Sequence, residues 1–167
     1  MTDNEHIFNL KRRIIDITYK NKLSHLSSTL SSLPIIYEIY TRKKPNEVFI
    51  LSNGHAGLAL YVVLEHFGGK NAEQLLKKHG IHPNRDLEDG IFCSTGSLGS
   101  GLPIAIGHAL ADRNKNVYCL ISDGECAEGS IWESLNYIHK KSLSNLEVYV
   151  NINGQSAIEK IDVDYLI

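Results

Sequence analysis

Cysteine is scarce in this 167-residue sequence, and its few copies are not arranged as a metal or disulfide framework requires. Cys93, Cys119 and Cys126 form no CxxC pair and share no repeated spacing. Such a pattern argues against a zinc site and against a small secreted domain held together by disulfides. We therefore expect reduced thiols, which fit a cytoplasmic protein.

The sequence also lacks a surplus of basic residues. It carries 17 Lys and Arg against 19 Asp and Glu, which gives a formal net charge of −2 and a pI near 6.4. Nucleic acids and anionic membrane surfaces select strongly basic proteins. We therefore expect neither of them as a partner and look to small molecules and other proteins instead.

Long apolar runs are missing as well. No segment reaches the ~18 apolar residues that are needed to span a bilayer. The first residues, MTDNEHIFNLKRR, contain no apolar signal-peptide core, and no internal repeat stands out. These absences predict a protein that is neither exported nor embedded in a membrane.

An alternation of strand and helix patterns runs along the chain. The length suits a single domain that covers residues 1–167. Short, apolar and β-branched runs predict buried strands at 47–52, 116–122 and 146–152. Because helical patterns alternate with these runs, the sequence predicts an α/β fold with a doubly wound parallel sheet and helices on both faces.

Apolar residues at helical spacing predict where the helices lie. The first is expected at 5–21, with Asp3 or Asn4 as its N-cap. The polar stretch SHLSSTLSS is expected to be a loop, and Pro34 is expected to open the second helix. Further helices are expected at 55–67, near 72–76, at 102–113 and at 128–141.

Two segments are candidates for a functional site. The first, residues 80–101, is rich in Gly, Ser, Asp and Pro, and a loop of this length inside a domain is unusual unless it has a function. The second is ISDGECAEGS, which places Asp123 and Gly124 at the carboxyl end of a buried strand and before a helix. Ligands of open α/β sheets bind at such junctions.

An acid at a strand end has two interpretations. Asp123 could simply cap the following helix, which for an isolated strand-Asp-Gly-helix junction is the favoured interpretation. Alternatively, it could bind a divalent cation that bridges the protein to a phosphate group. Asn153, about thirty residues later at the next strand end, offers a second hard oxygen of the kind that Mg²⁺ prefers. Together, Asp123 and Asn153 favour the metal-binding interpretation over the helix cap.

These residues resemble the thiamine diphosphate motif, with Ser122 in place of its leading glycine. The segments LSNGHAGLALY, HPNRDLEDGIFCSTGSLGSG and ISDGECAEGSIWES together look like the amino-terminal, diphosphate-binding region of transketolases, including the type that is split into two polypeptides. The resemblance runs from about Leu23 to Gln155. It implies thiamine diphosphate and Mg²⁺ as cofactors.

The resemblance also implies which residues hold these cofactors. Asp123, the Asn153 side chain and the backbone carbonyl of Gln155 would bind Mg²⁺, while Gly124 would lie against the diphosphate. Gly96 and Leu98, in a segment where Ser97 replaces the family's usual proline, would meet the cofactor rings through backbone groups.

Glu128 matches a family acid near the cofactor at a subunit interface. An acid favoured by the dipole in the first turn of a helix is an equally good explanation of this residue. By the same resemblance, Glu128 and Glu133 would lie nearest to a partner subunit.

Three histidines match family histidines by motif and spacing: His25, His55 and His82. We expect them to be catalytic, because ketol transfer moves protons on hydroxyl and carbonyl oxygens and imidazole titrates near neutral pH. The other histidines lie on or beside predicted helices, and no catalytic role is expected for His6, His66, His79, His108 and His139.

The resemblance implies a transketolase-like subunit that transfers a two-carbon ketol unit and needs a partner with a pyrimidine-binding domain, in a hetero-oligomer. Another thiamine diphosphate reaction, of the deoxyketose-phosphate synthase or 2-oxo acid type, and a non-catalytic assembly subunit remain open. Two departures from the family affect these expectations. Ser27 and Ser28 replace a usual glycine pair after His25. The chain also stops at Ile167, and for this reason the sheet is expected to be truncated.

Overall fold

Three parallel strands form the central sheet in the computed structural model, which describes residues 2–155, 160 and 164. β1 (Val48–Leu51), β2 (Val117–Ser122) and β3 (Leu146–Asn151) lie in the order β1-β2-β3, so the strand in the middle comes second along the chain. All three predicted strands are therefore confirmed. Because they are parallel, their carboxyl ends lie at one edge of the sheet.

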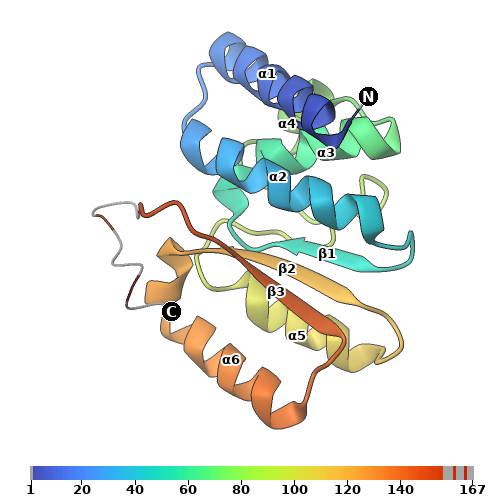
Figure 1. Cartoon of the computed structure of the whole chain (residues 1–167), viewed down its shortest axis with the longest axis vertical. Helices are drawn as coiled ribbons and strands as arrows, with labels where there is room; N and C mark the ends of the chain where they lie inside the picture. The colour runs from blue at the N-terminus through green and yellow to red at the C-terminus, as the bar shows by residue number, and fades with distance from the viewer. Residues whose placement is uncertain (1, 156–159, 161–163, 165–167) are drawn as a thin grey trace.

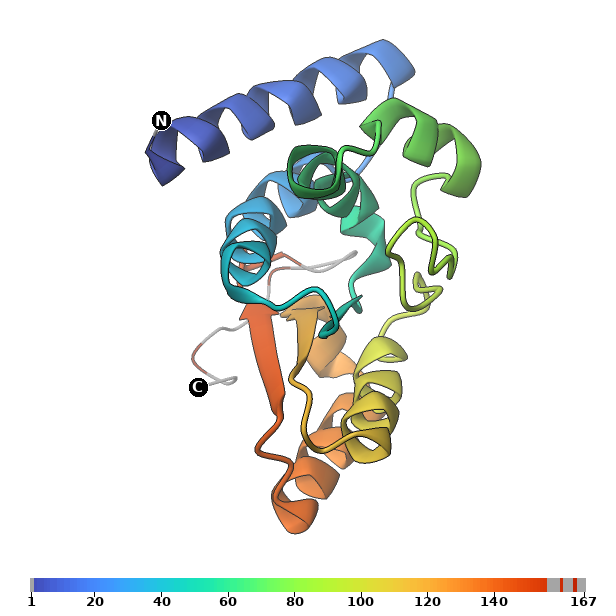
Figure 2. The ribbon, with the colours of Figure 1, turned by 90° about the vertical axis from the view of Figure 1, so that its right-hand side faces the viewer.

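Helices cover both faces of the sheet, as predicted (Figure 1). On one side, α2 lies next to the strands and α3 packs against α2, while α1 and α4 pack against these two helices from outside. On the other side lie α5 and α6, and Figure 2 shows the same two groups of helices from a perpendicular direction. The bounds are α1 Asp3–Asn21, α2 Leu26–Arg42, α3 Gly57–Gly68, α4 Ala72–His79, α5 Gly101–Ala111 and α6 Gly129–Lys141.

The middle strand separates two hydrophobic cores. Every residue of β2 is buried, because helices cover both of its faces. Tyr118 and Leu120 pack into the core under α2 and α3. Val117, Cys119 and Ile121 pack into the core on the α5 and α6 side. A strand that is buried on both faces shows no polar alternation, which explains its continuous apolar run.

The first helix begins two residues earlier than predicted, at Asp3. Thr2, and not Asp3 or Asn4, is the N-cap of α1. Its hydroxyl accepts a hydrogen bond from the Glu5 amide at 3.4 Å, and the Glu5 carboxylate accepts one from the Thr2 amide at 2.7 Å. This reciprocal capping box satisfies two backbone donors, which a single Asp or Asn cap does not do.

The loop predicted at residues 24–32 was also wrong, because α2 already begins at Leu26 and contains Pro34 in its interior. Thr29 and Ser32, which look like solvent-exposed loop residues in the sequence, are buried. The Thr29 hydroxyl donates to the His25 carbonyl at 2.9 Å, and Ser32 accepts from an asparagine at a strand end. Tertiary packing thus overrides the local signals of hydroxyl residues and proline.

Among the residues that the structure describes, no helix combines the length and the apolar character that crossing a membrane requires.

Candidate functional site

A cavity of about 450 Å³ lies at the carboxyl ends of the strands. It is bordered by the turn after β1, the start of α2, the long loop before α5 and the segments that follow β2 and β3. Of the ten residues predicted for the site, all but Glu128 line it. The full lining consists of His25, Ser27, Ser28, His55, His82, Gly96, Leu98, Ser122, Asp123, Gly124, Asn153 and Gln155.

Asp123 joins the ends of two neighbouring strands. It is almost completely buried, and its backbone amide donates to the Asn151 carbonyl at 3.1 Å. One carboxylate oxygen accepts from the Gly124 amide at 2.9 Å. The other accepts from the amides of Asn153 and Gly154, at 2.9 and 2.6 Å. The carboxylate therefore brings the segment after β3 to the end of β2, where both predicted side-chain ligands border the same cavity.

Asn153 supplies the second predicted metal ligand. Its side-chain oxygen accepts a hydrogen bond from the Gln155 amide at 3.0 Å, which folds the chain into a turn that also borders the cavity. Carboxylate, amide and carbonyl oxygens are hard donors, and such a set fits Mg²⁺ and not a thiolate-preferring metal. The donor chemistry of this corner therefore fits the predicted ion.

The long loop before α5 reaches the cavity at Gly96 and Leu98. It packs tightly against the turn after β1, since a Cβ atom at Gly54 would lie only 2.6 Å from the Thr95 carbonyl carbon. Gly96 has a φ of +147°, and a Cβ atom there would lie 3.1 Å from the His82 ring. The small residues thus let two loops and a histidine approach one another at the rim of the cavity.

The three predicted histidines come from three separate segments of the chain. His25 is the N-cap residue of α2, with a φ of 63°, while His55 lies in the short 3₁₀ turn Gly54–Ala56 and His82 follows α4. The ring centroids of His25 and His55 are 5.3 Å apart, and those of His25 and His82 are 6.3 Å apart. The fold therefore gathers them along one side of the cavity.

His55 differs from the other two in its burial. Burial lowers its pKa, and the nearby His25 and His82 lower it further, while Asp123 acts in the opposite direction. The net pKa lies below the ordinary value of 6.5. A neutral imidazole at this position can accept a proton near neutral pH, which is what a general base requires.

Glu128 does not line the cavity. It is exposed, and it is the N-cap residue of α6 without a side-chain cap hydrogen bond. Its side chain lies beside Gly99, because a Cβ atom at that glycine would lie 2.9 Å from the Glu128 Cβ. Its predicted position near the cofactor at a subunit interface stays a prediction.

One buried acid at the site carried no predicted role. Glu125 is completely buried, and its carboxylate accepts hydrogen bonds from three different segments around the cavity. The sequence signal was an acid two residues after Asp123, directly after an apolar strand. That pattern marks a cluster of acids but does not distinguish a ligand-facing carboxylate from one that faces inward.

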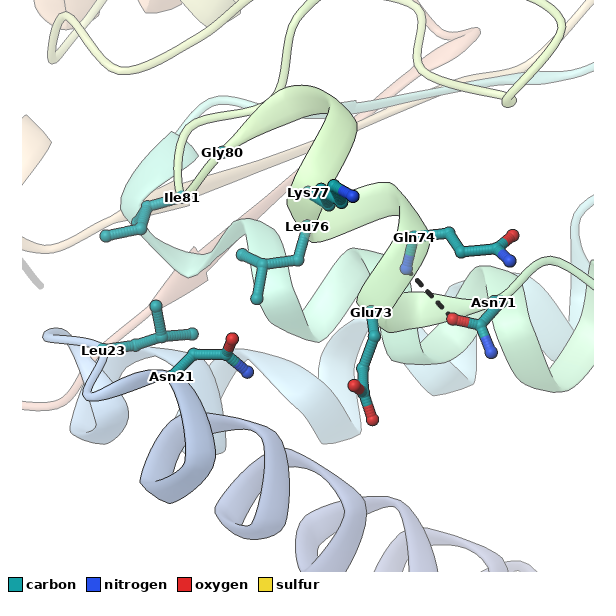
Figure 3. Close-up of a pocket in the computed structure, with 9 residues that line it drawn as sticks. All are labelled: Asn21, Leu23, Asn71, Glu73, Gln74, Leu76, Lys77, Gly80 and Ile81. Carbon is teal, nitrogen blue, oxygen red and sulfur yellow. Dashed lines mark hydrogen bonds between the residues drawn. The ribbon is translucent and has the colours of Figure 1, made fainter.

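A larger cavity of about 640 Å³ lies between the end of α1 and α4 (Figure 3). Leu23, Leu76 and Ile81 form an apolar part of its lining, and none of the residues predicted for chemistry borders it. The carboxylate in its lining, Glu73, is already paired with Arg13 and Lys20. The smaller cavity at the strand ends is therefore the candidate functional site.

His79, Asp86 and Asp89 also form a cluster with metal-ligand chemistry. Lys78 donates to both acids at 2.7 Å, so a cation already occupies the position between them. Lys78, followed by His79, holds the pKa of Asp89 well below its ordinary value. This cluster is an internal ion-pair network between the last turn of α4 and the loop that follows it.

Comparisons with known proteins identify the family to which the chain is similar. The family model described as "Transketolase, thiamine diphosphate binding domain" matches residues 8–162. One subunit of the apulose-4-phosphate transketolase of Phocaeicola vulgatus is 32% identical over 163 residues, covering 86% of this chain and 58% of that protein. The transketolase of Pongo abelii is 37% identical over 127 residues, covering 69% of this chain and 20% of that protein.

Among solved structures, a transketolase from Leishmania mexicana matches with a TM-score of 0.82 and 23% sequence identity. The match covers 99% of this chain and 30% of that one. At this identity the likeness shows the fold alone. The chain thus spans somewhat more than half of the Phocaeicola protein and about a fifth of the Pongo transketolase.

Proposed function

Since the chain belongs to the family of transketolase thiamine diphosphate-binding domains, we propose that it is the diphosphate-binding subunit of a transketolase-like enzyme. This enzyme transfers a two-carbon ketol unit between sugar phosphates or related sugars. One observation carries the proposal: a single cavity is bordered by three histidines and by the oxygen-rich ends of β2 and β3. The first set suits proton transfer on a sugar, and the second suits a metal-bound diphosphate.

The oxygen-rich corner of the cavity holds the cofactors in this proposal. Asp123 and Asn153, with the carbonyl of Gln155, bind Mg²⁺, and Gly124 lies against the diphosphate. Gly96 and Leu98 meet the cofactor rings. Thiamine diphosphate, when bound, supplies the carbanion chemistry that breaks and remakes a carbon–carbon bond. The donor set and the close approach of the glycine-containing loops support this assignment.

The three histidines bind the sugar and move protons to and from its oxygen atoms. His25 and His82 are exposed at the rim of the cavity and donate to or accept from substrate hydroxyls. His55 lies deeper, and its lowered pKa keeps it neutral so that it can take a proton from a hydroxyl whose carbon becomes a carbonyl. Ser27 and Ser28 add hydroxyls on the same side, where the family usually has glycines.

A second polypeptide with a pyrimidine-binding domain completes the enzyme, as a hetero-oligomer. The relative from Phocaeicola is itself named as one subunit of its enzyme, which supports a divided enzyme. We place the partner on α5 and α6, because a groove of about 410 Å³ runs between them and contains Glu133. Ser130, in this groove, donates to the Gly99 carbonyl at 2.9 Å, so the groove continues directly into the loop at the cavity.

The proposed subunit is one domain that covers residues 1–167 and acts in the cytoplasm. Cys93 and Cys119 are buried free thiols, and Cys126 is a partly buried one, which supports a reducing compartment.

To test this proposal, the purified chain is mixed with Mg²⁺, thiamine diphosphate, a ketose phosphate donor and an aldose acceptor. The reaction is run with and without a pyrimidine-binding transketolase subunit from the same organism. Mass spectrometry should then detect a ketose two carbons longer than the acceptor, in the mixture with the partner only. Calorimetry measures cofactor binding in parallel.

Each of the other outcomes identifies a different function. Turnover by the chain alone refutes the divided site. Tight complex formation without any turnover supports a non-catalytic assembly subunit. Activity only after a 2-oxo acid replaces the ketose phosphate supports a different thiamine diphosphate reaction.

A further inference from the structure

Glu125 is a completely buried carboxylate at the back of the candidate site. It belongs to the short 3₁₀ turn Gly124–Ala127 that follows Asp123. None of the ion pairs formed by the described residues involves it. A buried acid without a cation is costly unless hydrogen bonds compensate for its lost hydration. Its partners therefore show what this side chain is for.

Those partners come from three segments that border the cavity. Glu125 Oε1 accepts from the Ser52 hydroxyl after β1 at 2.6 Å and from the Gly99 amide in the loop before α5 at 2.9 Å. Oε2 accepts from the amide of Ser122, the last residue of β2, at 2.9 Å. One side chain thus connects the loop that carries Gly96 to the strand ends.

The hydrogen bonds around Glu125 require a carboxylate, and the side-chain amide of a glutamine cannot form all of them. The two Glu125 oxygens each face a backbone N–H group, on Gly99 and on Ser122. A glutamine has only one oxygen, so in either orientation its NH₂ group would point at one of these donors. Ser52 can adapt, because a hydroxyl can also accept a hydrogen bond, but the two backbone amides cannot.

The packing around the connection leaves little freedom for another arrangement. Gly99 has a φ of +76°, and its carbonyl accepts from the Ser130 hydroxyl at 2.9 Å, so the peptide groups on both sides of it are fixed. A Cβ atom at Gly101 would lie 2.6 Å from the Ser52 Cα. The start of α5 therefore sits directly on the end of β1.

We infer that Glu125 is a positioning residue, which fixes the loop bearing Gly96 and Leu98 relative to Asp123. In this role it sets the distance between the part of the cavity that takes the cofactor rings and the part that takes the metal-bound diphosphate. The inference rests on the proposed function, because it concerns cofactor binding. It adds a residue that needs no contact with cofactor or substrate.

The test compares Glu125→Gln with two controls in the full chain. Glu38→Gln changes the charge at an exposed position on α2. Ile17→Val removes a methyl group from the buried core beneath α1 and lowers the Tm without touching the site. Amide hydrogen exchange by NMR reports on Gly99 and Ser122 in the free chain. Calorimetric titration with thiamine diphosphate and Mg²⁺ reports on cofactor affinity.

In Glu125→Gln, exchange at Gly99 or Ser122 should become about tenfold faster or more, while the Leu120 amide in the middle of β2 stays protected. Cofactor affinity should fall by about tenfold or more, and a tenfold rise in Mg²⁺ should not restore it. Ile17→Val should keep the parent affinity despite its lower Tm. Glu38→Gln should change neither quantity.

Unchanged amide exchange and unchanged cofactor affinity in Glu125→Gln would overturn the inference. It would also be overturned if Ile17→Val lost as much cofactor affinity as Glu125→Gln for the same fall in Tm. If Glu125→Gln does not fold, Glu125→Asp decides. Its side chain is one methylene shorter and cannot reach the Gly99 and Ser122 amides together, so unchanged protection of both amides with unchanged affinity then contradicts the positioning role. If the parent itself binds no cofactor, alone or with its partner, the proposed function fails, while the exchange rates still test whether Glu125 fixes the loop.

Discussion

The Asp123 carboxylate has two tasks at once, because it holds the turn after β3 and borders the proposed metal site. Asp123→Ala should abolish metal-dependent binding of thiamine diphosphate, a loss of roughly 10²-fold or more in affinity. Asn153→Ala should weaken binding less, because water can replace a neutral ligand. Calorimetry at saturating Mg²⁺ measures both.

Asp112→Ala is the matched control, because that acid lies at the end of α5 and pairs only with Lys115 among the described ion pairs. Parent-like affinity in Asp123→Ala would refute the metal assignment. An equal loss in Asp112→Ala would show that the assay reports overall charge.

The histidines at the cavity should affect turnover and not cofactor binding. His55→Ala and His82→Ala should each keep nearly the parent affinity for thiamine diphosphate and lower kcat by roughly 10²-fold or more, as expected for a lost acid or base. Steady-state kinetics of the complex with its partner, together with calorimetry, separates the two effects. Failure of either variant to fold would show that the histidine is a structural residue.

The pKa of His55 should depend on its histidine neighbours. His25 lowers this pKa through its own positive charge when protonated, so His25→Gln should raise the His55 pKa toward its ordinary value of 6.5. An NMR titration of the His55 ring protons measures the change. His139→Gln, at an exposed position on α6, should leave it where it is. A His55 pKa that stays constant or falls in His25→Gln contradicts the electrostatic coupling of the cluster.

The turn after β1 and the loop before α5 are in direct backbone contact. In Gly54→Ala the new methyl group would meet the Thr95 carbonyl and the Gly96 amide at 2.6–2.7 Å, and neither can rotate away. We expect a loss of about 1–3 kcal/mol in the free energy of unfolding, because an overpacked site must shift its backbone. Urea denaturation provides the measurement.

Gly68→Ala serves as the comparison, since a methyl group there would meet nothing within 4 Å. It should keep the parent stability to within about 0.5 kcal/mol. Equal stability of the two variants would show that the loops yield more easily than their contact suggests.

At the scale of the whole molecule, the outer face of α5 and α6, on which we place the partner, carries exposed apolar side chains. Ile104 and Leu110 on α5 and Trp132, Leu135 and Tyr137 on α6 are each 38–47% exposed. Leu110→Glu should weaken the complex with the pyrimidine-binding subunit by about tenfold or more, since it would bury an unpaired charge.

Surface plasmon resonance with the immobilised partner measures this loss. Tyr19→Glu is the control, because Tyr19 is 86% exposed on α1, in the layer of helices on the other side of the sheet. An equal loss for Tyr19→Glu, or none for Leu110→Glu, would place the partner elsewhere.

Local pattern in the sequence was enough to predict the strands and most helices. β2 is a continuous apolar run because both of its faces are buried, and the helices α3, α5 and α6 follow their apolar periodicity. Parallel strands also place their carboxyl ends together, so the sequence was enough to assign Asp123 and Asn153 to one corner of the sheet. These features depend on near neighbours in the chain and on one rule of sheet geometry.

Only the tertiary structure determined which polar residues face inward. The hydroxyl-rich stretch at residues 24–32, which was predicted to be a loop, contains the first part of α2. Ser32 can be buried there because Asn53 and Asn151, at two strand ends, donate hydrogen bonds to it. Glu125 likewise points inward, toward donors 73 and 26 residues away along the chain. No local pattern encodes such partners, because a buried polar group is stable only where the fold brings its hydrogen-bonding groups to it.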